Sequence, residues 1–360
     1  MPTTAPPADS FDVVTMGRIG VDVYPLQAGV SLSDVETFGK FLGGSPTNVA
    51  VAAARLGRRT AVVTRTGQDP FGDYCHRALT DFGVDDRWVT PVPGLATPVT
   101  FCEIFPPDHF PLYFYRQSAP DLRIAAGELD LAAVRAARVF WATGTGLCEE
   151  PSREATLAAL AARSGGADPR SGGADPRGGG ADPRSGGADR APGTVATVLD
   201  LDWRPMFWPD GPQAARPVYR AALAHATVAV GNLDECEVAT GVRDPAACAD
   251  ALLDGGAELA VVKLGGDGVL AAHRDGTRVQ VPPHPVEVLN GLGAGDAFGG
   301  ALCHGLLAGW DLEHTVRRAN AAGALVASRL ACSTAMPTDA ELDDFLGAPD
   351  GNPPARTPTG

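Results

Sequence analysis

Lysine is almost absent from this chain of 360 residues, since only Lys40 and Lys263 occur among its 29 basic residues. Acidic residues number 43, so the net charge is −14, and no block of five or six basic residues occurs. Nucleic acids and anionic membranes both bind through basic surface, so this charge balance argues against either partner. An anionic ligand must therefore be held by a few local groups.

Long apolar runs are also lacking. The longest, such as residues 256–264, fall well short of the ~20 residues that a membrane helix needs. Residues 1–10 are rich in Pro and Thr and have neither the basic nor the apolar segment of a secretory signal. These features predict a cytoplasmic protein.

Cysteine is sparse and scattered, with seven residues and no CxxC pair. An odd number without such spacing indicates neither a disulfide framework nor a zinc site, so we expect reduced, buried thiols. GxxxxGK[ST], HExxH and GxSxG motifs do not occur, which removes the P-loop, zincin and nucleophile-elbow classes.

Strand-like and helix-like segments alternate along most of the chain. Short β-branched runs predict strands, and Ala-rich segments between them predict helices. The expected strands are 11–16, 60–64, 194–199, 228–230 and 259–264, and the expected helices are 49–56, 152–163, 214–224, 246–253 and 295–307. This order predicts a mostly parallel sheet covered on both faces, a three-layer α/β/α domain over residues 11–346.

Two regions break the alternation. Within residues 18–42 and 97–120, apolar and polar residues alternate without intervening helices. We expect a small antiparallel sheet that projects from the main body as a lid over a ligand.

A tandem repeat fills residues 164–190, in which SGGADPR recurs with small changes. Its only apolar residues are Ala, so burial cannot offset the conformational entropy that the segment would lose on becoming ordered. A coiled coil is excluded because no position of the repeat carries a large apolar side chain. Calcium binding by the repeated Asp is the alternative, but the Pro, Gly and Arg content favours a disordered loop. We expect the tails, 1–10 and 347–360, to be disordered as well.

The strongest chemical signal is the run Asn290-Gly-Leu-Gly-Ala-Gly-Asp296, after the strand-like residues 286–289 and before an amphipathic helix. Backbone amides of Gly293, Ala294 and Gly295 at a helix N-terminus favour a phosphate or a developing oxyanion. Asp296 beside them could accept a proton from an attacking hydroxyl, or it could only cap the helix. The run does not match a Rossmann loop, because GxGxxG would need Gly in place of Asp296.

A second glycine cluster, Gly43-Gly44-Ser-Pro-Thr-Asn48, begins the helix of residues 49–56. Paired glycines let a hydroxylated ligand approach the backbone, and the Asn48 amide both donates and accepts. The alternative is a plain turn and helix cap.

Three motifs together resemble the PfkB, or ribokinase-like, carbohydrate kinases. They are Gly43-Gly44 with Asn48, Ala50 and Leu56-Gly57; Thr66-Gly67-x-Asp69-x-Phe71-Gly72; and Gly293-Ala-Gly-Asp296. The resemblance covers residues 11–346 apart from the repeat. It implies a ribokinase-like fold with a β lid that transfers phosphate from ATP with Mg²⁺ to a sugar hydroxyl.

The resemblance also implies residue roles. Asp296 would be the catalytic base, and the amides of Gly293–Gly295 would form the anion hole. Asn232-x-x-Glu235 is similar to the family's NxxE motif, in which Glu235 would act on Mg²⁺ indirectly; the alternative is an ordinary exposed helix residue. The run of residues 263–268 looks like the nucleotide loop, with Lys263, Gly265 and Gly268, although Lys263 could simply end a strand. Asn320 matches a position that lines the adenine pocket.

On the acceptor side, Asp22 corresponds to the aspartate that holds sugar hydroxyls, with a turn residue as the alternative. Arg116 follows the aromatic run Tyr113-Phe-Tyr and offers a bidentate fork for a carboxylate, which resembles sugar-acid kinases. Arg18 and Arg204 are further candidates for that carboxylate. We therefore expect a six-carbon sugar acid as the acceptor.

Two points depart from, or go beyond, the family pattern. Asn290 stands where the family usually has an aspartate that contributes to a monovalent-cation site, so the resemblance gives no support for that cation. Lid strands of the family often pair between subunits, which implies a possible homodimer.

A different class of function is also open: the protein could be a non-catalytic sensor of sugar acids. Retention of both Asp296 and Glu235 favours an enzyme.

Overall fold

A computed structural model of the chain describes residues 10–164 and 195–347. The predicted disorder of the repeat and of the two tails concerns residues outside these ranges, apart from residues 10, 164 and 347 at their borders.

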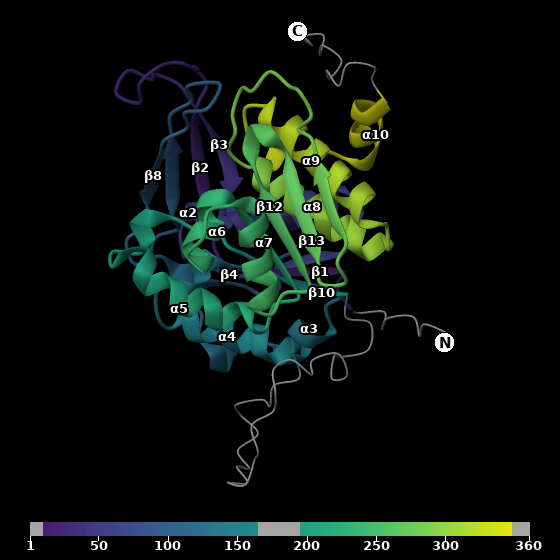
Figure 1. Cartoon of the computed structure of the whole chain (residues 1–360). Helices are drawn as coiled ribbons and strands as arrows, with labels where there is room; N and C mark the ends of the chain where they lie inside the picture. Colours follow the sequence, from purple (N-terminus) through teal and green to yellow (C-terminus); the bar gives the residue numbers. More distant parts are fainter. Residues whose placement is uncertain (1–9, 165–194, 348–360) are drawn as a thin grey trace, which may run out of the picture.

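The centre of the molecule is one large sheet, in strand order β14-β13-β12-β11-β10-β9-β1-β4-β5, with β6 also paired to β4 (Figure 1). Neighbouring strands from β12 to β5 run parallel, and β13 and β14 add antiparallel pairs at one edge. The strands are β1 (Val13–Met16), β4 (Thr60–Gly67), β5 (Val84–Asp85), β6 (Val89–Val92), β9 (Val139–Thr143), β10 (Ala196–Asp200), β11 (Val228–Asn232), β12 (Leu259–Lys263), β13 (Val269–His273) and β14 (Arg278–Val281). The predicted mostly parallel sheet is confirmed.

Helices cover both faces of this sheet. Successive strand residues point to opposite faces, and Val13 and Val14 accordingly belong to two different buried clusters. One cluster includes residues of α1 (Ser45–Arg55), α2 (Pro70–Asp81), α8 (Ala294–Ala308), α9 (Leu312–Ala327) and α10 (Asp339–Gly347). The other includes residues of α3 (Leu131–Ala136), α4 (Ser152–Arg163), α5 (Gly211–Leu223), α6 (Leu233–Thr240) and α7 (Pro245–Asp254). The result is the expected three-layer α/β/α arrangement.

The lid is a separate four-stranded sheet in the order β3-β2-β7-β8 (Figure 1). It consists of β2 (Gly20–Pro25), β3 (Phe38–Gly43), β7 (Val99–Cys102) and β8 (Leu112–Tyr115). The β2–β3 and β7–β8 pairs are antiparallel, but β2 and β7 are parallel, so the prediction of an antiparallel lid was wrong for its central pair. The reason is connectivity: between β2 and β7 the chain passes through α1, β4 and α2 of the main domain, and then returns to the lid in the original direction.

A second prediction was also wrong, because residues 286–289 form no strand. The amides of Leu289 and Asn290 both donate to the carbonyl of Ala327, the last residue of α9. This segment therefore lies against a helix end and pairs with no strand of the sheet.

Helices α1 and α8 pack closely because α8 carries two adjacent glycines. A Cβ at Gly299 would lie 2.7 Å from Cη2 of the buried Trp141, and one at Gly300 would collide with Ala52 of α1. Because no side chain separates the helices here, the first turn of α8 comes within hydrogen-bonding reach of the first turn of α1.

All seven cysteines are unpaired, and six of them are buried, in agreement with the expected reduced thiols. Within residues 10–164 and 195–347, no helix has the length and apolar character needed to cross a membrane.

Candidate active site

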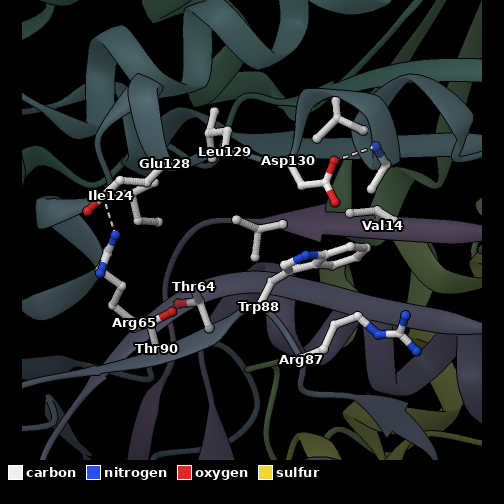
Figure 2. Close-up of a pocket in the computed structure, with 13 residues that line it drawn as sticks. Val14, Thr64, Arg65, Arg87, Trp88, Thr90, Ile124, Glu128, Leu129 and Asp130 are labelled. Carbon is white, nitrogen blue, oxygen red and sulfur yellow. Dashed lines mark hydrogen bonds and ion pairs between the residues drawn. The ribbon is translucent and has the colours of Figure 1, made fainter.

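One pocket, with a volume of about 500 Å³ including open solvent, lies on the α3 side of β1 and β4 (Figure 2). Its lining includes Val14, Trp88 and the ion pair of Arg65 with Glu128. None of the site residues predicted from the sequence lines this pocket.

The predicted residues gather instead where the parallel strands end. Arg18 follows β1, Thr145 follows β9, Asp202 and Arg204 follow β10, and Lys263 ends β12. The carboxyl edge of an open parallel sheet is where such folds bind ligands, because the loops leaving several strands converge there. The N-termini of α1 and α8 and the base of the lid complete the site.

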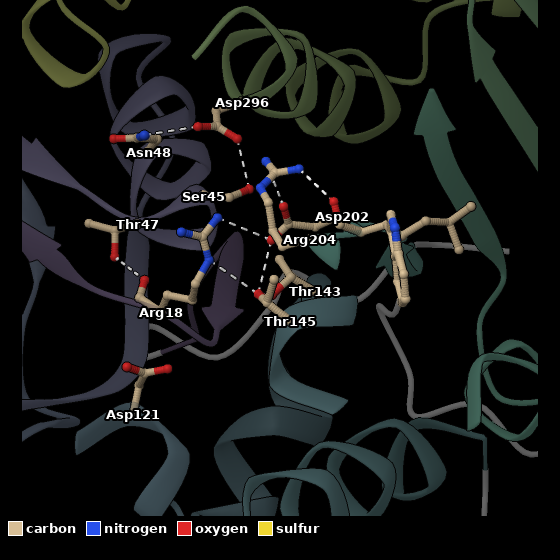
Figure 3. Close-up of polar contacts among 12 residues, drawn as sticks. Arg18, Ser45, Thr47, Asn48, Asp121, Thr143, Thr145, Asp202, Arg204 and Asp296 are labelled. Atoms are coloured by element: carbon tan, nitrogen blue, oxygen red, sulfur yellow. Dashed lines mark hydrogen bonds and ion pairs between the residues drawn. The ribbon is translucent and has the colours of Figure 1, made fainter. Parts of the chain in front are cut away.

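Asp296 lies in the first turn of α8 and is held by α1 (Figure 3). Ser45 Oγ donates to its Oδ1 at 2.7 Å, and Asn48 Nδ2 donates to its Oδ2 at 2.8 Å. The N-cap of α8 is Gly293, and both carboxylate oxygens of Asp296 face α1, so this geometry does not support a helix-capping role. Burial raises the pKa of Asp296, and the two hydrogen bonds oppose that rise. A base with a raised pKa is suited to accept a proton.

Residues 290–295, called the anion loop below, precede Asp296 at the start of α8. Gly293 is left-handed, at φ 82°, and a Cβ there would lie 2.7 Å from Cys332 Sγ. The first intrahelical bond runs from Ala297 N to Gly293 O, so the amides of the first turn have no acceptor inside the helix, although the Ala294 amide donates to Gly291 O in the loop at 3.4 Å. A Cβ at Gly295 would lie 3.2 Å from Lys263 Nζ, which places this ammonium group beside the loop. Oriented amides and a lysine together fit a phosphate.

Asp202 joins the two arginines that follow β1 and β10. Its Oδ2 accepts from Arg18 Nη2 at 3.3 Å and from Thr145 Oγ1 at 2.9 Å, and its Oδ1 lies 2.9 Å from Arg204 Nη2 (Figure 3). Burial alone would raise the pKa of Asp202, but Arg204 and Arg18 outweigh it and lower that pKa below its ordinary value. Asp202 is therefore an ionised anchor for both guanidinium groups.

Asp200, at the end of β10, has the opposite character. Burial raises the pKa of Asp200, neighbouring carboxylates add to that rise, and Lys263 opposes it. Burial would lower the pKa of Lys263, but the carboxylates around it, led by Asp200, raise it. Lys263 consequently keeps its positive charge beside the anion loop.

Asn232 and Glu235 form a capping box at the start of α6. Asn232 Oδ1 accepts from Glu235 N at 2.9 Å, and Glu235 Oε2 accepts from Asn232 N at 2.7 Å. Glu235 is only 5% exposed, which contradicts the alternative of an exposed helix residue, and its Oε1 lies 3.6 Å from Arg204 Nη1.

The described residues fit Mg²⁺ only together with a nucleotide. Within residues 10–164 and 195–347 no three His, Cys, Asp or Glu side chains are grouped to hold a metal ion. Mg²⁺ in phosphoryl-transfer sites is commonly held by substrate phosphates and few carboxylates, which suits the indirect role predicted for Glu235.

Asp22, on β2, is 8% exposed and lies over Gly43 on β3. A side chain at Gly43 would collide with its carboxylate, and one at Gly44, at φ 101°, would collide with the Arg18 carbonyl. These two glycines therefore make room for protein groups, and Gly44 is the N-cap of α1, as the turn-and-cap alternative states. Burial raises the pKa of Asp22 to about 6, against the hydrogen bond from Tyr24.

Arg116, just after β8, is already paired. Its Nη2 donates to Asp121 Oδ2 at 2.9 Å, and both side chains are largely buried. The guanidinium also lies over the ring of Phe207, 4.6 Å from its centre. Because Phe114 of β8 contacts the same ring, the lid and the loop after β10 meet here.

Three buried polar atoms around the site have no hydrogen-bond partner in the described part of the chain: Asn48 Oδ1, Asp121 Oδ1 and Arg204 Nε. Buried polar groups are normally satisfied. Hydroxyl groups of a ligand would donate to Asn48 Oδ1 and Asp121 Oδ1, and a hydroxyl or carboxylate oxygen would accept from Arg204 Nε.

The remaining predicted residues have structural contacts. Gly265 and Gly268 form the turn between β12 and β13, and Asn320 Nδ2 donates to the Pro282 carbonyl, which ties α9 to the segment after β14. Asn290 is fully buried; its Nδ2 donates to Leu330 O at 2.7 Å and its Oδ1 accepts from Leu292 N at 3.0 Å. An ionised aspartate could not donate the first of these bonds.

Sequence reasoning missed Ser45, Thr145, Asp200 and Asp202 as site residues. Ser45 lies inside the glycine cluster that was recognised, and the run Asp200-x-Asp202-x-Arg204 directly follows a predicted strand. Polar residues at a strand's carboxyl end were the available signal. Thr145 had no such local signal.

Comparison with known proteins agrees with this geometry. The family model "pfkB family carbohydrate kinase" matches residues 10–170 and 190–339. A 5-dehydro-2-deoxygluconokinase of Photobacterium profundum is 33% identical over 93% of this chain and 95% of its own length, and one of Shouchella clausii is 30% identical over 92% and 94%.

Solved structures show the same fold. A PfkB protein of Polaromonas is 25% identical with a TM-score of 0.75, covering 93% of this chain and 99% of its own. A fructokinase of Vibrio cholerae bound to fructose, ADP and potassium is 26% identical with a TM-score of 0.72, covering 94% and 100%. With its three-layer fold, β lid, anion loop and Asp296, the chain belongs to the pfkB family of carbohydrate kinases.

Proposed function

We propose that this kinase phosphorylates a six-carbon sugar acid, 5-dehydro-2-deoxy-D-gluconate, at its terminal C6 hydroxyl with ATP as the donor. The observation that carries the proposal is the carboxylate of Asp296, held by Ser45 and Asn48 beside the anion loop. The relatives named 5-dehydro-2-deoxygluconokinase support the choice of acid, and 2-dehydro-3-deoxygluconate is the alternative acceptor.

Asp296 is proposed to act as the general base. The C6 hydroxyl gives its proton to a carboxylate oxygen of Asp296 while the hydroxyl oxygen forms a bond to the γ-phosphorus of ATP. The bond from that phosphorus to the bridging oxygen of ADP breaks, and ADP keeps the electron pair. Transfer of the proton to a positioned base typically contributes ~10²–10⁴-fold to the rate.

The anion loop is proposed to stabilise the charge of the transferring group. The amides of the first turn of α8, together with the ammonium of Lys263 beside Gly295, would stabilise the negative charge that increases during transfer. When bound together with ATP, Mg²⁺ would further neutralise the phosphate oxygens. Asn232, Glu235 and Arg204 are proposed to keep that side of the site polar and fixed, and Asn320, Gly265 and Gly268 to border the adenine of the nucleotide.

The acceptor is proposed to lie between the main domain and the lid. Asp22 and Asn48 are positioned to bind its hydroxyl groups, and Arg116, with Arg18 and Arg204 nearby, to bind its carboxylate. Arg18 and Arg204 are partly neutralised by Asp202, and Arg116 by Asp121. The carboxylate would therefore bind to already oriented guanidinium groups, which lowers the entropic cost of binding.

An assay that couples ADP release to NADH oxidation tests the proposal. We expect 5-dehydro-2-deoxygluconate to give a kcat/KM well above those for 2-dehydro-3-deoxygluconate, fructose and ribose, with mass spectrometry locating the phosphate at C6. A higher kcat/KM for 2-dehydro-3-deoxygluconate would show that this acid is the acceptor in place of 5-dehydro-2-deoxygluconate. Efficient phosphorylation of a neutral sugar would overturn the sugar-acid assignment and leave the kinase assignment standing.

We also propose a homodimer formed through the lid. One face of the lid exposes the rings of Phe38, Tyr113 and Tyr115, and Phe101 contacts both Phe38 and Tyr115. An aromatic patch of this kind is typical of an interface. Light scattering should give twice the chain mass for the wild type and a monomer for Tyr115→Glu, and a monomeric wild type would contradict the proposal.

A further inference from the structure

Tyr24 connects two parts of the site that the proposed function treats separately. It lies two residues after Asp22 on β2, so both side chains point to the same face of the lid sheet. Its hydroxyl donates to Asp22 Oδ2 at 3.0 Å and lies 2.8 Å from Cys332 Sγ. The side chain is 2% exposed and belongs to a small cluster with Cys102, Ile104 and Cys332.

Cys332 in turn contacts the anion loop. The space that a side chain at Gly293 would need is filled by Cys332, whose Sγ lies 2.7 Å from the position of the missing Cβ. A continuous chain of contacts therefore runs from Asp22 on the lid through Tyr24 and Cys332 to Gly293 at the start of α8.

The hydrogen bonds in this chain have one consistent direction. A tyrosine hydroxyl has a single proton, and the ionised Asp22 can only accept, so that proton goes to the carboxylate. The Cys332 thiol is then the donor to the tyrosine oxygen. Burial raises the pKa of Cys332 well above its ordinary value, which keeps the thiol protonated for this purpose.

We infer that Tyr24 is a positioning residue of the acceptor site: it fixes the orientation and the ionised state of Asp22 and, through Cys332, aligns the acceptor with the anion loop. The inference rests on the proposed role of Asp22 in binding acceptor hydroxyls. Tyr24 itself touches neither the acceptor nor the nucleotide in this arrangement.

The charge of Asp22 depends on this hydrogen bond because burial, the largest influence on its pKa, disfavours ionisation. Arg18 and the Tyr24 hydroxyl stabilise the carboxylate, whereas burial and Asp296 destabilise it. The other titratable groups that interact with Asp22 are Tyr74, Cys75, Cys102 and Cys332. Loss of the Tyr24 hydroxyl should therefore raise the pKa of Asp22 above about 6, toward the pH at which the enzyme works.

The test compares Tyr24→Phe with the wild type in steady-state kinetics from pH 5.5 to 8.5. We expect KM for the acceptor to rise about tenfold near pH 6.5, as for loss of a hydrogen bond to a charged group. KM for ATP should stay within about twofold, and the acidic limb of kcat/KM for the acceptor should move to higher pH. A purely structural role would not move that limb. Tyr113→Phe, which removes a hydroxyl bonded to the Glu103 carboxylate and keeps the ring, is the matched control and should match the wild type.

Variants of Cys332 test the second half of the chain. Cys332→Ser keeps a donor to Tyr24 and should behave like the wild type, whereas Cys332→Ala removes it and should raise KM for the acceptor by less than Tyr24→Phe does. Equal effects of the serine and alanine variants would overturn the role of Cys332.

Asp22→Asn separates failure of this inference from failure of the proposed function. If Asp22→Asn raises KM for the acceptor but Tyr24→Phe changes neither KM nor the pH profile, the inference on Tyr24 is wrong and the role of Asp22 stands. If Asp22→Asn leaves KM for the acceptor unchanged, both are wrong. ADP binding by calorimetry should be retained in every variant, and a Tyr24→Phe protein that lost it together with acceptor binding would show a structural role and overturn the inference.

Discussion

Ser45 Oγ donates a hydrogen bond of 2.7 Å to Asp296 Oδ1, although the two residues are 251 positions apart. Ser45 begins α1 and Asp296 lies in the first turn of α8. The bond means that the proposed base is oriented by the helix that begins at the glycine cluster. Two segments recognised separately in the sequence are therefore parts of one site.

Ser45→Ala should change the pH dependence of the reaction. The Ser45 hydroxyl stabilises the ionised carboxylate, so its removal raises the pKa of Asp296 further. Because the base must be ionised, the acidic limb of the kcat–pH profile should move to higher pH, by about one unit for a lost bond of about 1.5 kcal/mol. Ser328→Ala, whose hydroxyl bonds Leu325 O in α9, should leave the profile in place. An unchanged profile for Ser45→Ala would show that this hydrogen bond does not control the ionisation of the catalytic base.

Asp296→Asn should bind ATP normally and lose most turnover. The substitution removes the proton acceptor but leaves the loop amides and Lys263 in place, so kcat should fall by about 10²–10⁴-fold. Single-turnover kinetics measures the loss, and calorimetry measures ATP affinity. Near-wild-type kcat in the purified variant would refute the role of Asp296 as the base.

Gly300→Ala should destabilise the protein and lower its activity. The new methyl group would collide with Ala52 and push α8 away from α1, at a cost of about 1–3 kcal/mol for overpacking. The same movement would lengthen the bonds of Ser45 and Asn48 to Asp296. Urea unfolding gives the change in free energy. Gly127→Ala, where a Cβ meets open space, is the control and should stay within about 0.5 kcal/mol of the wild type.

The proposed role of Arg116 in binding the acceptor carboxylate is best tested by substitution with lysine, because Arg116 is also paired with the buried Asp121. Arg116→Ala would leave the buried Asp121 unpaired, which costs about 3–5 kcal/mol and would confuse folding with binding. Arg116→Lys keeps the charge but loses the bidentate fork, so KM for the sugar acid should rise several-fold with KM for ATP unchanged. Arg317→Lys, on the outer side of α9, should change neither value. Indifference of the acid KM to Arg116→Lys would assign the carboxylate to Arg18 or Arg204.

Replacing residues 164–190 with a short Gly/Ser linker should leave kcat/KM and the melting temperature nearly unchanged. The repeat connects the end of α4 to β10, and the site lies at the other end of β10, roughly 16 Å away at 3.3 Å per residue. If the repeat is disordered, as the sequence predicts, shortening it changes the closure entropy by only about 0.6 kcal/mol per halving of its length. A large drop in either quantity would show that the repeat contacts the fold or a partner.

The sequence by itself determined the alternation of strands and helices, the covered parallel sheet and the lid, because these depend on local periodicity and on Gly and Pro punctuation. It also predicted a role for Asp296 and for the anion loop, since closely spaced glycines before an acidic residue at a helix start expose backbone amides to an anion. Local pattern was insufficient at residues 286–289, where an apolar run meets the end of α9 in place of a strand.

Only the tertiary structure decided which side chains meet. Nothing near Ser45 indicates that its hydroxyl bonds Asp296, because that contact depends on how closely α1 and α8 cross, and Gly299 and Gly300 set that approach. The pairing of Arg116 with Asp121 and of Arg18 with Asp202, and the parallel register of β2 and β7, likewise depend on chain crossings. Periodicity reports which face a residue occupies, whereas its partner is chosen by the packing of elements distant in the chain.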